Sequence, residues 1–548
     1  MGGLKNNTND MRWVVLVGIA WFGVVFAGLF VPLMDNDSAH HANIALRMFL
    51  TGDYVSLIDY DGPYLDKPHL HFWLSAASYH MFGVNGFAYK FPSFLISLLG
   101  IWAVYRSGCI LINRQAGIWS AMIYATSAAI LLSLNDVRMD AILTACVAIS
   151  IWQIGGYFSA GNIKYVVGAA LGMAMGFCTK GHIGIFIPIL FALTYAYYSK
   201  KWRRVLSWKA IVAILLFFLF ISPVVYCYYL QFNLHPELVV RGINNIDGVR
   251  FILWDQSLGR FSGEMGGDAK GDKLFFLHTF LWVFAPWSLV GLISFVYYSK
   301  IKRLSALTRA VLVVTAVFAL IVGFSSFKLP HYLNVILPLT SLWIAGLTTH
   351  DKNIFLWVSK WVERGMWSLI GLFAGMLLIW WFPDQSILFW VGLVIYLAIL
   401  FYLIKIRTGN QTSLQIMRLS AATLVIFWML NSGFYPHLLK YQAGNVLAER
   451  EEVQHIKDPI YSLGGFYSSS FYFYRKELRK EVGLEKMREE VNSIIMDKRQ
   501  MSEFLQLNDG WRIKKSNLDY EITKLDLKFL DREKRNDHCN EVIIMTRN

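Results

Sequence analysis

The chain has 548 residues, of which 56% are apolar and only 16% are charged. Soluble domains carry roughly 25% charged residues, so this composition excludes an ordinary water-soluble enzyme and indicates a polytopic membrane protein. The formal net charge of +14 does not call for nucleic acid, because Lys and Arg of membrane proteins collect in short loops on one side of the bilayer. We therefore expect membrane lipids, and no nucleic acid, as partners.

Long apolar runs divide most of the chain into segments that could cross a bilayer. A crossing helix needs about 20 mostly apolar residues, which predicts about thirteen transmembrane helices and a mainly α fold. They begin near Arg12, Phe87, Ala116, Met139, Tyr165, His182, Trp208, Leu274, Leu307, Leu329, Gly365, Ser386 and Leu419. Residues 179–182 interrupt one apolar stretch, and we expect a tight turn between two helices there.

The basic residues predict the orientation of these helices. With the N-terminus inside, the predicted inner loops hold the cluster 200–204, which contains two Lys and two Arg. The outer segments then collect the acids, above all the two long loops 35–86 and 232–273. An odd number of crossings places the C-terminus outside.

The tail changes composition at about residue 438. Apolar runs such as 459–463 and 542–545 alternate with charged segments, and a charged helical stretch is expected near 475–505. This pattern suits a small α/β domain in water. The predicted organisation is a transmembrane domain over 1–437 and a soluble domain on the outer side over 438–548.

The first outer loop, 35–86, should hold one or two short amphipathic helices that lie along the membrane. Ile44, Ala45, Met48 and Phe49 follow helical spacing, and Gly52 is suited to end that helix. The loop is rich in carboxylates and histidines, and it directly follows the first apolar run. A polar segment in this position must lie in water or line a polar cavity, so we interpret it as one wall of an active site.

Ionisable residues recur at the same ends of several predicted membrane helices. Asp37 follows the first helix, Asp140 opens the fourth, Lys180 and His182 lie between the fifth and sixth, and His331 opens the tenth. Such groups are costly near a membrane unless they are paired or hydrated, so we expect these ends to converge on one outward-facing cavity. A carboxylate there could deprotonate a hydroxyl, and cations could neutralise a departing phosphate.

The spacing leaves two other readings open. Each carboxylate could be a solvated loop residue. A proton-coupled transporter or a lipid-linked sugar flippase would also place Asp, Lys and His within its membrane part. Transporters carry such groups near the bilayer midplane, often with internal repeats, whereas here they gather at one face. The pattern therefore favours chemistry at the membrane surface.

Six short motifs follow one another in a recognisable order. They are DSAHHANIA (37–45) with TGDY (51–54), YLDKPH (64–69), RMD (138–140), TKG (179–181), RF (260–261) and KLPHY (328–332). Over about residues 12–435 this set resembles the polyprenyl-phosphate-dependent membrane glycosyltransferases of the GT-C class. The resemblance is greatest to the ArnT-like branch of lipid A aminoarabinose transferases, which is related to the protein O-mannosyltransferases.

The resemblance implies a GT-C bundle of transmembrane helices with periplasmic amphipathic helices. It implies transfer of one sugar from a polyprenyl-phosphate donor to a lipid A, glycan or protein acceptor at the periplasmic face of the bacterial cytoplasmic membrane. A protein O-mannosyltransferase-like activity on Ser or Thr is the alternative within this class.

The resemblance also implies roles for individual residues. Asp37, as base or acceptor-orienting group, and Asp66 and Asp140, as acids of the same cavity, would be the catalytic residues. The donor phosphate would meet Lys67, Lys180, His40, Arg138 and Tyr332. No cofactor is firmly implied; a divalent metal, if bound, would take Asp37, Asp66 and His41 as candidate ligands.

Two motifs depart from the family pattern. The first motif usually continues with Glu and then Arg-Tyr, where this chain has Ser38, His40 and His41. The RF motif is often preceded by Glu-His, where this chain has Gln256 and Ser257. A metal held by the family's His would lose that ligand here, and His40, His41 or His69 would have to replace it.

Overall fold

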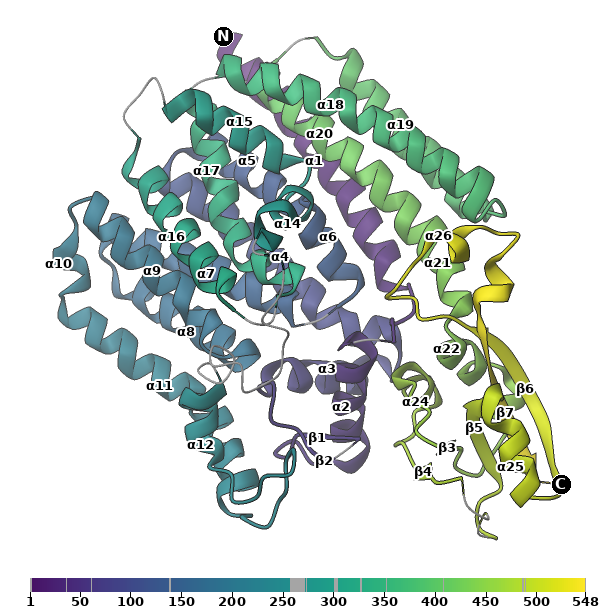
Figure 1. Ribbon diagram of the computed structural model, residues 1–548. Helices are drawn as coiled ribbons and strands as arrows, with labels where there is room; N and C mark the ends of the chain where they lie inside the picture. The colour runs from purple at the N-terminus through teal and green to yellow at the C-terminus, as the bar shows by residue number, and fades with distance from the viewer. Residues whose placement is uncertain are drawn as a thin grey trace.

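The computed structural model describes residues 2–35, 37–60, 62–137, 139–256, 272, 274–299, 304–325, 328–350, 352–407, 409–484, 487 and 489–547. A large bundle of helices occupies most of the molecule, and a small sheet domain stands beside one end of it (Figure 1). The helices of the bundle are α1 (Gly2–Leu29), α4 (Gly86–Leu111), α5 (Arg114–Ala125), α6 (Ala128–Asn135), α7 (Asp140–Ala160), α8 (Ile163–Lys180), α9 (Ile183–Tyr198), α10 (Trp202–Val205), α11 (Trp208–Tyr228), α14 (Phe275–Val283), α15 (Trp287–Ser299), α16 (Ala306–Gly323), η3 (Pro330–Ile336), α17 (Leu337–His350), α18 (Lys352–Gly375), α19 (Ile387–Lys405) and α20 (Gln411–Trp428).

The chain is a multi-pass membrane protein, but the predicted number of crossings is not confirmed. Among the described residues, nine helices are long and apolar enough to cross a membrane, or eleven if two bent helix pairs each count as one. The predicted helices near Tyr165 and His182 are α8, which has 18 residues, and α9, which has 16. They form a hairpin through the expected tight turn.

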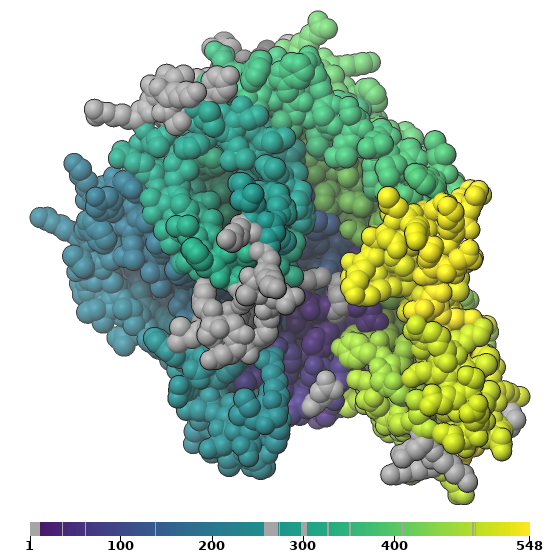
Figure 2. Space-filling model, viewed as in Figure 1, coloured from purple at the N-terminus to yellow at the C-terminus, as the bar shows by residue number. Residues whose placement is uncertain are grey.

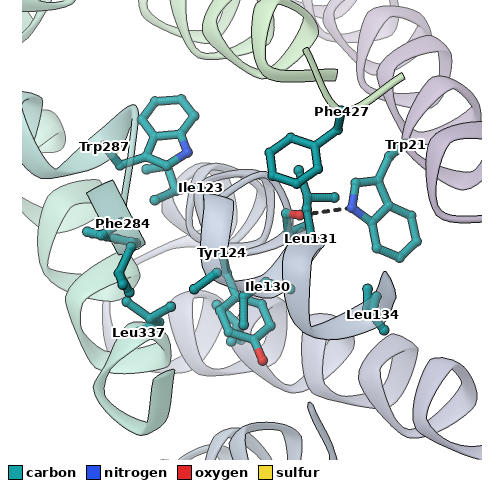
Figure 3. Packing of buried hydrophobic residues seen from close by; sticks show 14 of the residues in the cluster. Trp21, Ile123, Tyr124, Ile130, Leu131, Leu134, Phe284, Trp287, Leu337 and Phe427 are labelled. Carbon is teal, nitrogen blue, oxygen red and sulfur yellow. Dashed lines mark hydrogen bonds between the residues drawn. The ribbon is translucent and has the colours of Figure 1, made fainter. Parts of the chain in front are cut away.

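Two of the membrane helices are broken, and a hydrogen bond joins the two breaks. The pairs α5–α6 and α14–α15 bend by 53° and 114°, and each bend frees backbone groups that lipid cannot satisfy. The N–H of Ala128, at the first break, donates to the carbonyl of Ala285, at the second, over 3.0 Å. The indole of Trp21 on α1 donates to the carbonyl of Ala125 over 2.8 Å, within a cluster of buried aromatic and aliphatic side chains (Figure 3).

The α8–α9 hairpin positions one wall of the site described below. Gly181 has a positive φ of +71°, and its N–H donates to the carbonyl of Phe177 over 2.7 Å. Glycine adopts this conformation without the cost that a Cβ imposes. Gly176 and Gly184 let the two helices approach closely, since a Cβ on Gly184 would lie 2.3 Å from the carbonyl carbon of Gly176. Lys180 is therefore fixed at the end of α8.

The first long loop forms two helices, as expected. They are α2 (Asp37–Thr51) and α3 (Leu70–Phe82), joined through the short strands β1 (Ile58–Asp59) and β2 (Gly62–Pro63). Ile44, Ala45 and Met48 lie on the buried face of α2, and Gly52 follows its last residue with φ of +72°. The two helices lie at the end of the bundle that faces the sheet domain (Figure 1).

The tail forms a sheet domain, which confirms the predicted small α/β unit. Its five strands have the order β4-β3-β5-β7-β6, with β3 parallel to β4 and β5, and β7 antiparallel to β5 and β6. The elements are α22 (Ala443–Ala448), α23 (Glu451–Gln454), β3 (Tyr461–Leu463), α24 (Ser469–Arg475), β4 (Glu481–Val482), β5 (Ser493–Asp497), α25 (Met501–Leu507), β6 (Trp511–Asp519), α26 (Leu527–Leu530) and β7 (Asn540–Arg547). The prediction of a charged helical stretch near 475–505 was wrong, because this segment forms β4 and β5 and only the start of α25.

Two buried histidines at the start of α3 make the stability of the folded protein depend on pH. Burial lowers the pKa of His69 and of His71 to about 4. Above about pH 6.5 both histidines are neutral in the folded and the unfolded chain; below it the unfolded chain takes up protons that the folded chain refuses. Stability is therefore lost as the pH falls from about 6.5 to about 4, by about 2 kcal/mol per histidine at pH 5.

This dependence can be measured in detergent. We expect a lower unfolding temperature at pH 5 than at pH 7.5, and a smaller difference between the two pH values for the variant His71→Gln, which cannot take up a proton. An equal difference in the variant and the original chain would show that His71 does not contribute.

Candidate functional site

A cavity of about 560 Å³ lies where α2 meets the ends of α7, α8 and η3. One part of its wall is polar and carries charges of both signs. The other part is apolar and comes mainly from α9, α16 and η3. The polar lining residues are Asp37, His40, His41, Tyr64, Asp66, Lys67, Asp140, Lys180, His182, Arg241, Gln256, Ser325, His331 and Tyr332, and the apolar ones are Met139, Leu143, Ile183, Phe186, Phe318, Ile321, Val322, Leu329 and Val335.

The structure brings together eight of the candidate residues from the sequence. The eight that line this one cavity are Asp37, His40, His41, Asp66, Lys67, Asp140, Lys180 and Tyr332. Arg138 and the RF motif at 260–261 lie outside the described residues. The side chains therefore share one site, while the role of each remains a prediction.

An ion pair between two helix ends forms the centre of the polar wall. Lys180, the last residue of α8, donates from Nζ to Oδ1 of Asp140, the first residue of α7, over 2.7 Å. The side chains are only 8% and 5% exposed. A cation at a helix C-terminus and an anion at an N-terminus both complement the helix dipole. Nε2 of His331 lies 3.7 Å from Oδ2 of the same aspartate, and the Lys180 ammonium lies 5.4 Å from the centre of the Tyr332 ring.

Asp66 is held by a residue that the sequence did not single out. Nη2 of Arg241 donates to Oδ1 of Asp66 over 2.5 Å, and the side chain of Gln256 donates to the Asp66 carbonyl over 2.8 Å. Arg241 comes from the second long loop, so no motif or helical spacing marks it in the sequence. It adds a guanidinium to the ammonium groups of Lys67 and Lys180 around the cavity.

The N-terminal turns of α2 supply a further polar edge. Asp37 is the first residue of α2 and is exposed to the cavity, and His40 lies one turn further along. Nε2 of His40 and Oδ2 of Asp59 are 2.8 Å apart, and the Tyr64 hydroxyl lies 3.5 Å from Nε2 of His41. His40, which stands where the first motif usually has arginine, is thus paired with the Asp59 carboxylate.

The donor set does not fit a metal site. Within the described part of the chain, no group of three or more His, Cys, Asp or Glu side chains is placed to hold a metal ion. Asp37, Asp66 and His41 line the same cavity without forming such a group, and Asp66 is paired with Arg241. His69, the other candidate, instead bonds the carbonyl of Val55 through Nε2 over 2.8 Å.

Treatment with a chelator tests this geometry. Because Asp66 is paired with Arg241 and His41 lies beside the Tyr64 hydroxyl, we expect purified protein to keep its activity after dialysis against EDTA. Loss of activity that returns on adding a divalent cation would show a metal requirement that these residues do not explain.

The arrangement suits one kind of ligand. Charged donors at one side of the cavity can hold an anionic group, and the adjoining apolar wall can hold a hydrocarbon chain. Groups buried in this way act more strongly on a phosphate than they would in water. The site can therefore bind an amphipathic phosphate and place a carboxylate, Asp37, beside it.

The chain is similar in sequence to a known family and to several curated proteins. Residues 66–227 match the family described as dolichyl-phosphate-mannose-protein mannosyltransferase. The undecaprenyl phosphate-alpha-4-amino-4-deoxy-L-arabinose arabinosyl transferase of Pseudomonas aeruginosa is 27% identical over 274 residues, which is 48% of this chain and 45% of that protein. A protein of the same description from Proteus mirabilis is 22% identical over 343 residues, 60% of this chain and 58% of that one. The chain thus spans about half the length of the curated relatives it matches.

Solved structures extend the likeness to nearly the whole chain. ArnT from Cupriavidus metallidurans bound to undecaprenyl phosphate superposes with a TM-score of 0.71 at 15% identity, over 97% of this chain and 98% of that one. The same protein without ligand gives a TM-score of 0.72. The resemblance first drawn from the motifs is confirmed: the chain is a GT-C fold protein similar to the ArnT-like membrane glycosyltransferases.

Proposed function

We propose that this chain is a glycosyltransferase that moves one sugar from a polyprenyl-phosphate donor to an acceptor at the periplasmic face of the bacterial cytoplasmic membrane. The observation that supports this most is the cavity of about 560 Å³ in which Lys67, Lys180 and Arg241 adjoin an apolar wall. The curated relatives are named for an undecaprenyl phosphate donor, and the solved relative holds undecaprenyl phosphate.

The donor would bind with its phosphate at the polar wall. Lys67, Lys180 and Arg241 supply the positive charge, and Tyr332 lies beside the Lys180 ammonium. The isoprenoid chain would follow the apolar residues of α9 and α16, such as Phe186 and Phe318. Asp140 and Asp66 would act as partners that fix Lys180 and Arg241, rather than as groups that touch the sugar.

Asp37 would act as the base for the acceptor hydroxyl. Its carboxylate orients an acceptor hydroxyl and takes its proton while the hydroxyl oxygen bonds to the anomeric carbon. The bond from that carbon to the phosphate oxygen breaks, and polyprenyl phosphate leaves with the electron pair. The nearby cations stabilise the charge that develops on the phosphate.

The basic cluster supports the proposed orientation. Lys200, Lys201, Arg203 and Arg204 lie in the connection after α9, at the opposite end of that helix from Lys180 and the cavity. Clusters of this kind stay in the cytoplasm. The cavity and the sheet domain would then face the periplasm.

Reconstituted protein tests the proposal. Liposomes would contain the purified chain, a polyprenyl-phosphate sugar with a labelled sugar, and either lipid A or a Ser- and Thr-containing peptide. We expect the label to appear on an acceptor while free polyprenyl phosphate accumulates. Label on the peptide alone would instead assign the protein O-mannosyltransferase-like activity that the family match at 66–227 suggests. Movement of intact donor across the bilayer without cleavage would identify a flippase and overturn the proposal.

A further inference from the structure

We propose that Asp35 is a positioning residue, through which the C-terminal sheet domain fixes Asp37 in the cavity. The inference rests on the proposed function and assigns a task to a domain whose sequence carries no recognisable chemistry. It follows from the contacts of the short segment between α1 and α2.

The carboxylate of Asp35 is bound by serines from the sheet domain. The hydroxyl of Ser468 donates to Oδ2 over 2.6 Å, the backbone N–H of Ser470 donates to Oδ1 over 3.1 Å, and the Ser470 hydroxyl donates to Oδ2 over 3.2 Å. Burial raises the pKa of Asp35, while these hydrogen bonds oppose the rise. These hydrogen bonds hold the carboxyl group in place, because a buried polar group that loses its partner is costly.

The backbone of the same segment is also bound by the tail. The N–H of Asp35 donates to Oε1 of Gln442 over 2.7 Å, and Nε2 of Gln442 donates to the Leu33 carbonyl over 2.9 Å. The N–H of Leu33 donates to the Tyr474 hydroxyl over 2.9 Å. The chain just before Asp37 is therefore held on both its side-chain and its backbone groups by residues more than 400 positions away.

The sheet domain also contacts α2 directly. Nδ2 of Asn43, in the middle of α2, donates to the carbonyl of Ser469 over 2.6 Å and to the carbonyl of Ala39 over 2.9 Å. In Figure 2 the light-green start of the tail lies directly against the purple N-terminal segment. Asp37 is the first residue of α2 and follows Asp35 by two positions, so a shift of this contact moves its carboxylate.

A second contact reaches the segment between β1 and β2, where the Tyr60 ring lies 6.2 Å from the ring of His40 on α2. The Tyr60 and Tyr467 rings meet edge to face at 5.2 Å, and the Arg479 guanidinium lies 5.5 Å from the centre of the Tyr60 ring. Tyr60 follows Asp59, the partner of His40 at the cavity. The sheet domain thus contacts the segments that position both Asp37 and His40 at the cavity. Misplacing a reacting group by about 1 Å can reduce the rate of a reaction about 100-fold.

Kinetics of matched variants test the proposal. Asp35→Ala and the double variant Ser468→Ala with Ser470→Ala should lower kcat about 100-fold, while KM for the donor stays close to that of the original chain. The single variant Ser468→Thr keeps a hydroxyl at this position and leaves Ser470 unchanged, so it should retain most of the activity of the original chain. The control is Arg535→Gln: Arg535 also joins the tail to the membrane part, through the Trp381 carbonyl at 2.6 Å, but not through α2. This control should keep its kcat.

A structural measurement separates the inference from the proposed function. Hydrogen exchange at the α2 amides should be faster in Asp35→Ala and unchanged in Arg535→Gln, whether or not sugar transfer is observed. Unchanged exchange at α2 and an unchanged kcat in Asp35→Ala would overturn the inference while leaving the proposed function intact. An equal loss of kcat in Arg535→Gln would also overturn it, because general docking of the tail would then explain the effect. Absence of transfer by the original chain would refute the proposed function alone.

Discussion

Replacing Asp37 by asparagine should slow sugar transfer at least about 100-fold and leave donor binding intact. Asparagine has nearly the same shape as aspartate but cannot accept a proton, so it removes the proposed base without emptying its place. A positioned base contributes about 100- to 10,000-fold to a rate, and we expect kcat to fall within that range. Asp37 is exposed to the cavity and is not part of the buried core, so the fold should persist.

Single-turnover transfer and donor binding, measured on the same preparations, check this result. Asp509→Asn is the matched control, because Asp509 is an exposed carboxylate of the tail just before β6 and does not line the cavity. It should behave as the original chain. If Asp37→Asn kept most of its kcat, another group would have to take the acceptor's proton.

Replacing Lys180 by alanine should affect both stability and donor binding. The change leaves the Asp140 carboxylate without its ammonium partner where it is only 5% exposed. Breaking a buried ion pair costs about 3–5 kcal/mol, and we expect about 3 kcal/mol, since His331 lies near the remaining charge. Loss of one of the cations around the phosphate should weaken donor binding by at least about 10-fold.

A double variant separates these two effects. Asp140→Asn combined with Lys180→Met removes both charges, so it should recover most of the lost stability without recovering donor affinity. Lys164→Ala is the control on the same helix: Lys164 is an exposed residue at the opposite end of α8. Thermal unfolding and binding of polyprenyl phosphate are the measurements. Donor affinity that is equal in Lys180→Ala and the control would remove Lys180 from the phosphate site.

The sequence was most informative where a charge had to be compensated. Asp140 and Lys180 stand at the ends of apolar helices, and a membrane protein must pair such groups or hydrate them. Their convergence could therefore be expected, and they form an ion pair at 2.7 Å. The tight turn after Lys180 could be foreseen as well, because Gly181 has the conformational freedom that the turn needs.

Features set by distant contacts could not be predicted. The break between α5 and α6 falls at Thr126 and Ser127, and residues 118–135 around it contain no Gly or Pro. Hydrogen bonds stabilise it: the indole of Trp21 donates to the Ala125 carbonyl, and the Ala128 N–H donates to the Ala285 carbonyl at the second break. A count of apolar runs cannot detect such a break. Arg241 lies in a loop without periodicity, so only the fold shows that it meets Asp66. For the same reason the serines that bind Asp35 could not be found from the sequence.

The most direct test of the account is the structure of this protein with a polyprenyl phosphate bound. We expect the phosphate within hydrogen-bonding distance of the Lys180 ammonium and close to Lys67 and Arg241, with the isoprenoid chain along Phe186 and Phe318. A phosphate bound elsewhere, with this cavity filled by water alone, would contradict the claim that these side chains form the donor site.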